Sequence, residues 1–162
     1  MHRRTLLGGA TALAATMLAA CAAGTMTPAT VADDVTLITT AFTAMLPTLA
    51  STPGISAAAT ASVDQAVVDL QSAAAAVAAA DTTVSARPVV VRVEANVNAV
   101  IAVLAGLTLP APISTILEAV SVLLPVIEAA VGLTAPVGTE PGTMTPAQAR
   151  AVLRALSVPT SK

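Results

Sequence analysis

The side chains that could do acid–base or metal chemistry are few and scattered along this chain of 162 residues. Glu118 and Glu128 come nearest to a catalytic pair, but if both lie on one helix they are about 15 Å apart. That distance exceeds the separation at which two carboxylates cooperate in glycoside hydrolysis, so we interpret them as part of a solvated face. Asp64, Asp69 and Asp81 have no histidine or cysteine partners and lack the loop spacing of a calcium site. We therefore expect scattered surface charges and no metal site.

The other reactive residue types also argue against an enzyme. The chain has a single histidine, His2, and a single cysteine, Cys21. It contains no glycine-rich phosphate loop, no Ser-x-x-Lys and no Gly-x-Ser-x-Gly. One Phe, no Tyr, no Trp and a formal net charge of −2 leave neither stacking platforms nor a basic patch for nucleic acid. We expect no catalytic residues, no cofactor and no nucleic-acid partner.

The N-terminal segment combines a charged pair, a short apolar run and small residues before the cysteine. These features are Arg3 and Arg4, residues 6–18, and the string Leu18, Ala19, Ala20, Cys21. Positive charge, an apolar stretch and small residues at a cleavage point are typical of a secretory signal peptide. The apolar stretch is too short for a spanning helix, which needs roughly 20 residues. The string before and including the cysteine resembles the lipobox of bacterial lipoproteins.

That resemblance implies that residues 1–20 are cleaved and that the mature protein begins at a lipidated Cys21 on a membrane. The alternative is an ordinary cleaved signal with a cysteine near its cleavage site. Arg3 and Arg4 followed by two leucines also resemble a twin-arginine signal, but without Ser or Thr before them or Phe at position 6. Both export routes therefore stay open. Ala22, which is not Asp, implies by the same resemblance the outer membrane, facing the periplasm.

Apolar residues that recur at steps of three and four predict helices along the rest of the chain. We expect the four main helices near residues 30–49, 56–80, 88–107 and 113–133. The first begins with a capping box of Thr30 and Asp33, and the third begins at Pro88, a favourable first helical residue. A short final helix is predicted after Thr145, which can act as its N-cap. Pro146 then occupies the first turn, and Gln148 completes a capping box with Thr145.

Short turns between these helices favour antiparallel neighbours, so the predicted fold is all-α. We expect an antiparallel up-down bundle of about four helices plus a short C-terminal helix. The chain is divided as follows: signal peptide 1–20, lipidated tether 21–30, helical bundle 31–133, a linker rich in Pro, Gly and Thr at 134–145, and a short helix 146–157.

Three groups of polar residues are expected to face solvent. They are the stripe Ser114, Glu118, Ser121, Pro125, Glu128 and Gly132; the group Arg92, Glu94, Asn96 and Asn98; and the pair Arg150 and Arg154. The second group could instead line an internal polar site or fix helix register. The third could instead contact anionic headgroups. Solvent exposure is the favoured interpretation for all three.

Together these features predict a non-enzymatic, lipid-anchored helical envelope protein that associates with itself or with another envelope protein. Outside the first 21 residues the composition resembles small Ala-rich lipoproteins of high-GC bacteria, which implies no particular activity.

The first alternative is a membrane-active protein of the phage lysis or pore-forming kind, because residues 89–109 and 113–133 are long enough to span. Against it, each charged residue in them costs up to about 2.5–3.5 kcal/mol at mid-bilayer. The second alternative is a carrier for a lipid or another apolar ligand, which a smooth core of alanine and valine permits.

Overall fold

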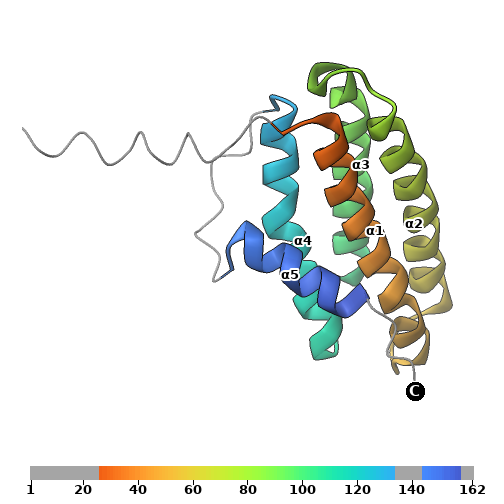
Figure 1. Ribbon diagram of the computed structural model, residues 1–162. Coiled ribbons are helices and arrows are strands. Elements are labelled where there is room, and N and C mark those ends of the chain that lie inside the picture. The colour runs from red at the N-terminus through yellow and green to blue at the C-terminus, as the bar shows by residue number, and fades with distance from the viewer. Residues whose placement is uncertain (1–25, 134–143, 158–162) are drawn as a thin grey trace, which may run out of the picture.

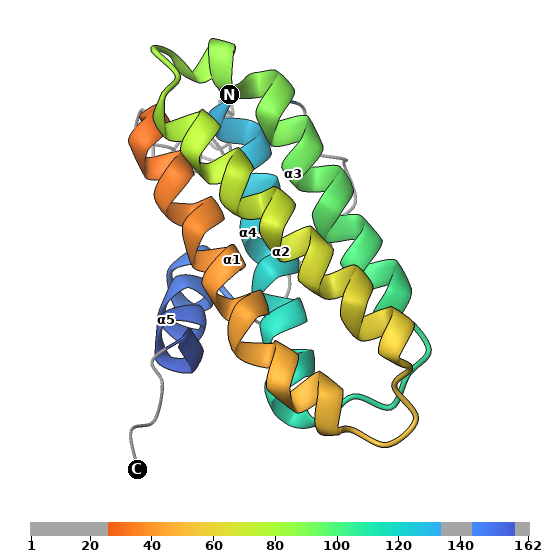
Figure 2. The same ribbon diagram turned by 90° about the vertical axis from the view of Figure 1, so that its right-hand side faces the viewer.

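The computed structural model describes residues 26–133 and 144–157, and every element in these ranges is an α-helix (Figure 1). The helices are α1 (Pro28–Ser51), α2 (Ala57–Ala78), α3 (Thr83–Leu104), α4 (Ala111–Ala130) and α5 (Pro146–Ser157). Short turns connect the four helices from α1 to α4, and each of α2, α3 and α4 runs antiparallel to the helix before it (Figures 1 and 2). The predicted all-α up-down bundle with an additional C-terminal helix is confirmed.

The four long helices form a ring of neighbours, and the fifth covers one side of it. α1 packs against α2 and α4, and α3 closes the ring between α2 and α4. α5 lies across the outside of α4 and α1 (Figure 1). Within the described ranges α5 makes no contact with α2 or α3, so the outer face of those two helices is uncovered.

The core is built from the apolar stripes that the spacing predicted. Its buried members include Val31, Val35, Ile38, Phe42, Met45 and Leu49 from α1; Val63, Val67, Leu70, Ala74 and Val77 from α2; and Val93, Val97, Val100 and Leu104 from α3. Leu107, which continued the third stripe, is only half-buried because α3 ends at Leu104. Since the chain has a single Phe and no other aromatic residue, aliphatic contacts supply nearly all of this packing.

The start of α3 differs from the prediction, because the helix begins at Thr83 and Pro88 lies inside it. Thr82 Oγ1 accepts a hydrogen bond from the Ser85 amide at 3.1 Å, and Ser85 Oγ accepts one from the Thr82 amide at 3.1 Å. This reciprocal pair is a capping box in which serine replaces the usual Glu or Gln. It starts the helix five residues before the proline, so the predicted start at Pro88 is wrong.

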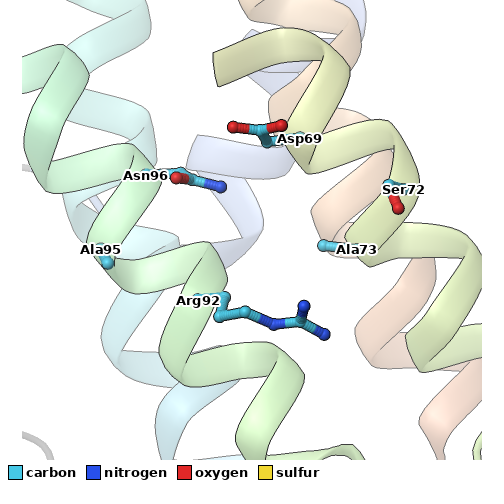
Figure 3. A pocket seen from close by; sticks show the side chains of 6 residues that line it. All are labelled: Asp69, Ser72, Ala73, Arg92, Ala95 and Asn96. Carbon is cyan, nitrogen blue, oxygen red and sulfur yellow. The ribbon is translucent and has the colours of Figure 1, made fainter. Parts of the chain in front are cut away.

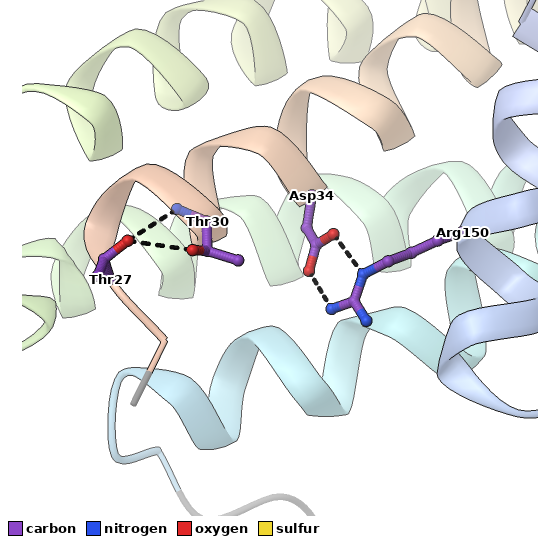
Figure 4. A network of polar contacts seen from close by, with 4 residues as sticks. All are labelled: Thr27, Thr30, Asp34 and Arg150. Atoms are coloured by element: carbon purple, nitrogen blue, oxygen red, sulfur yellow. Dashed lines mark hydrogen bonds and ion pairs between the residues drawn. The ribbon is translucent and has the colours of Figure 1, made fainter. Parts of the chain in front are cut away.

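The start of α1 also differs in its capping residue. Thr27, not Thr30, is the N-cap, and Pro28 occupies the first turn. Thr27 Oγ1 accepts a hydrogen bond from the Thr30 amide at 3.3 Å (Figure 4). The predicted capping box of Thr30 and Asp33 is therefore wrong, because the helix has already begun before Thr30.

The predicted capping box at the start of α5 is confirmed. Gln148 Oε1 accepts a hydrogen bond from the Thr145 amide at 2.8 Å, and Thr145 Oγ1 accepts one from the Gln148 amide at 3.3 Å. These bonds satisfy two amides that the first turn of a helix otherwise leaves without partners.

The end of α4 is closed by a Schellman motif, which needs a left-handed residue just past the helix. Gly132 supplies it with φ of 73°. The Leu133 amide donates to the Glu128 carbonyl at 2.9 Å, and the Gly132 amide donates to the Ala129 carbonyl at 3.1 Å. Arg87 of α3 then donates from Nε to the Val131 carbonyl and from Nη2 to the Gly132 carbonyl, both at 3.1 Å. This arginine ties α3 to the end of α4.

Gly132→Ala is therefore expected to destabilise the bundle by about 2 kcal/mol, because it adds backbone strain at positive φ and displaces the Arg87 guanidinium from its hydrogen bonds. A Cβ at this position would meet Arg87 Nη2 at 2.7 Å. Gly54→Ala is the matched control, because Gly54 has φ of 88° and nothing within 4 Å of its added Cβ. It should cost only about 1 kcal/mol, the backbone strain alone. If urea unfolding shows the same loss of unfolding free energy for both variants, the Arg87 side chain moves aside without an energetic cost.

Candidate functional site

The predicted lipidation site and signal residues lie outside the described residues. These are Arg3, Arg4, Leu18, Ala19, Ala20 and Cys21, and most of the predicted linker at 134–145 lies outside them as well. α1 begins at Pro28, seven positions after the cysteine. At no more than about 3.5 Å per residue, that length of chain spans at most about 25 Å. If Cys21 is acylated, the N-terminal end of α1 lies near the membrane.

The two glutamates of α4 have different surroundings, although they share the predicted polar stripe. Glu118 is exposed, as expected, whereas Glu128 is only 4% exposed. The prediction of a solvated face is wrong for Glu128, because it lies where α3 packs against α4 and Glu94 lies close by. Burial raises the pKa of Glu128, and the charge of Glu94 raises it further.

Glu128→Gln is expected to stabilise the protein at pH 8 by about 1 kcal/mol, because a neutral amide avoids the desolvation of a carboxylate and its repulsion by Glu94. Because the pKa of Glu128 is raised on folding, the native state binds this proton more tightly than the unfolded chain. The wild type therefore loses stability as the pH rises from the ordinary glutamate pKa through the raised one. Thermal melts should show the advantage of the variant vanishing near pH 4. An advantage of equal size at pH 4 and pH 8 would contradict this account.

The aspartates of α2 and of the turn after it are surface charges, as predicted. Asp64, Asp69 and Asp81 are all exposed. Among the described residues, no three His, Cys, Asp or Glu side chains are grouped closely enough to hold a metal ion.

The most specific polar contact joins Arg150 of α5 to Asp34 of α1 (Figure 4). Arg150 Nε donates to Asp34 Oδ1 at 2.7 Å, and Nη2 donates to Oδ2 at 2.6 Å. The Asp34 side chain is 5% exposed and that of Arg150 is 25% exposed. Hydrogen bonding to this carboxylate raises the pKa of Arg150 above its ordinary value. The prediction of a solvated Arg150 is wrong, whereas Arg154 is exposed as predicted.

The polar group of α3 divides between the two sides of the helix. Arg92 and Asn98 are exposed as predicted, but Glu94 and Asn96 are half-buried. Arg92 and Asn96 line a groove of about 330 Å³ between α2 and α3 (Figure 3). Its other lining residues are Asp69, Ser72, Ala73 and Ala95.

Within this groove the carboxylate of Asp69 and the guanidinium of Arg92 do not form an ion pair. Asp69 accepts a hydrogen bond from Gln65 Nε2 at 3.1 Å on its own helix. The Arg92 guanidinium extends from α3 towards α2, away from the Asp69 carboxylate (Figure 3). Among the residues that the structure describes, Arg150 and Asp34 form an ion pair, whereas Arg92 and Asp69 do not. The groove thus presents a carboxylate, an amide and a guanidinium to solvent.

Two further hollows lie between α1 and α2. One, of about 660 Å³, is mainly apolar and lies beside the α1–α2 turn; its lining includes Leu46, Pro47, Ala50, Ile55, Ala57 and Ala61. The other, of about 470 Å³, is lined by Thr36, Thr39, Thr40 and Thr43 with Gln71, Ala74 and Ala75 of α2. Both hollows are open to solvent, and the second reaches the edge of the core at Ala74.

Two of the described helices, α1 and α4, are long and apolar enough to cross a membrane. The predicted span at 113–133 overlaps α4, but the one at 89–109 does not correspond to a qualifying helix. α3 ends at Leu104 and carries Arg87, Arg92 and Glu94. About half of the apolar stretch in α1 and 44% of that in α4 is buried inside the bundle. Core helices of water-soluble bundles have the same properties.

Comparison of the chain with protein-family models, with curated proteins and with solved structures gives no match.

Proposed function

We propose that this chain is a lipid-anchored protein of the bacterial envelope, with its helical bundle held at the periplasmic face of the outer membrane. In this proposal residues 1–20 are removed, Cys21 is acylated, and the bundle has a non-enzymatic structural or interaction role. The string Leu18, Ala19, Ala20, Cys21 after a charged and apolar N-terminus is the observation that carries the proposal.

The way the bundle uses its charged side chains supports an interaction role over catalysis. Asp34 and Arg150 join α5 to α1, and Arg87 joins α3 to the end of α4. These contacts hold the helices in place relative to one another, and they occupy the charged groups of Asp34, Arg150 and Arg87. The uncovered outer face of α2 and α3 provides a surface for a partner.

Metabolic labelling with palmitate tests whether Cys21 is acylated. A variant at Ala22, the residue after the cysteine, tests which membrane holds the protein. The wild-type protein is expected to incorporate label and to fractionate with the outer membrane. Ala22→Asp is expected to keep the label but to shift the protein to the inner membrane, because lipoproteins with Asp after the cysteine are retained there. Absence of label in the wild type would refute the lipid anchor. A labelled Ala22→Asp protein that stays in the outer membrane would refute only the sorting step.

Membrane activity is the second candidate, supported by the length and apolar character of α1 and α4. It requires these helices to leave the bundle, where Val31, Phe42 and Ile127 are fully buried. Release of a dye from vesicles by the purified protein would support it. Intact vesicles at micromolar protein would favour the anchored bundle.

A further inference from the structure

We infer that the outer face of α2 and α3 binds the same face of a second copy of this chain, forming a symmetric dimer. This inference deepens the proposed function, on which it rests, because it names the partner of the anchored bundle.

The first observation is where the exposed large apolar side chains lie. In the described ranges they are Val68 of α2 and Val84, Val91 and Val103 of α3, with exposed fractions from 36% to 67%. All four belong to the two helices that α5 leaves uncovered. Small side chains, including Ala95 and Ser72, line the groove between the two helices and allow close approach of another helix surface. A partner bound on these two helices would remove this exposed apolar surface from water.

The second observation is that the same face carries two opposite charges without an ion pair between them. Asp69 lies on α2 and Arg92 on α3, on the two sides of one groove (Figure 3). Both residues are exposed, so each is accessible to a neighbouring molecule. A face that carries a carboxylate on one helix and a guanidinium on the next is complementary to itself.

A two-fold axis can bring the carboxylate of one copy opposite the guanidinium of the other. If the axis lies in the plane of the face and runs along the groove, α2 of each copy lies over α3 of the other. Asp69 of one copy then faces Arg92 of the second, and the symmetry repeats the pair on the other side. Such an isologous contact closes at two copies, which limits assembly to a dimer.

The area of this face is sufficient for a specific contact when the whole face is buried. α2 and α3 each have 22 residues, so each is about 33 Å long, and each helix is about 10 Å wide. The face therefore covers up to about 650 Å² per copy, or about 1,300 Å² in total. That lies within the range of about 1,200–2,000 Å² found for specific interfaces.

Charge reversal tests the inference through pairs of variants in the full-length chain. Two copies with different C-terminal tags are co-expressed, extracted in mild detergent and purified through one tag. Wild-type copies are expected to co-purify. Asp69→Arg with itself, or Arg92→Asp with itself, should lower the co-purified fraction at least tenfold, because like charges then face each other. Co-expression of Asp69→Arg with Arg92→Asp should restore it, since both opposite-charge pairs form again.

Asp64→Arg is the matched control, because it makes the same charge change on α2 but lies beside the apolar hollow next to α1. It should co-purify with itself as the wild type does. The inference is overturned if wild-type copies do not co-purify, if the single reversals have no effect, or if mixing them fails to restore association. The readout uses whole extracts, so a failure of lipidation at Cys21 would leave it unchanged. The two proposals can therefore fail independently.

Discussion

Replacing Cys21 by serine, in a chain whose residues 1–20 are exchanged for an ordinary cleavable secretory signal, is expected to release the protein completely into the soluble periplasmic fraction. Each buried methylene of an acyl chain contributes about 0.8 kcal/mol, and stable anchoring takes more than one chain. In the proposed anchor the thiolate of Cys21 accepts the lipid, and a serine hydroxyl does not replace it. Fractionation by ultracentrifugation, followed by immunoblotting, measures the distribution.

The wild type with its own signal is the reference and should stay in the membrane pellet. Circular dichroism of the released variant should show the helical content and melting temperature of a folded bundle, because Cys21 precedes α1 by seven positions. A released, folded bundle would exclude the membrane-active alternative. If the folded variant stays with membranes, helices such as α1 or α4 hold it there and the anchor is unnecessary.

Arg150→Ala is expected to destabilise the protein by about 3 kcal/mol. The Asp34 carboxylate is 5% exposed and receives both of its strong hydrogen bonds from this guanidinium. Removing one partner leaves a buried charge without compensation, which costs about 3–5 kcal/mol when burial is complete. The low end applies because the Arg150 side chain is itself 25% exposed. Chemical denaturation measures the loss.

Two companion variants separate the ion pair from other effects of the arginine. Arg154→Ala removes an exposed arginine one turn further along α5 and should change stability by no more than about 0.5 kcal/mol. The double variant Asp34→Leu with Arg150→Met should recover most of the loss, because apolar side chains of similar size replace the buried pair. A loss below about 1 kcal/mol for Arg150→Ala would show that the contact does not hold α5 in place.

The sequence predicted the bundle because its core depends on local periodicity. The stripe from Val31 to Leu49 lies on one face of a helix whatever its neighbours are, and that face is buried. Helix starts were less predictable. Thr82 and Ser85 form a reciprocal capping box in which serine replaces the usual glutamate. The sequence pattern with Glu or Gln at that position therefore does not identify it.

The polar contacts of the bundle could not be predicted, because they depend on how helices distant in sequence meet. Asp34 and Arg150 are 116 positions apart, and helical spacing contains no information about that contact. Glu128 continues a polar stripe with Glu118, yet the packing of α3 against α4 buries it. The Asp69–Arg92 groove likewise exists only once α2 and α3 are neighbours.

Intact mass spectrometry of the protein purified from membranes distinguishes an acylated Cys21 from an unmodified chain. A lipid-anchored protein gives a chain that begins at Cys21, lacks residues 1–20, and carries the added mass of a diacylglyceryl group with or without a further acyl chain. A chain that begins at Met1, or one that begins near Cys21 with an unmodified thiol, would contradict the lipid anchor.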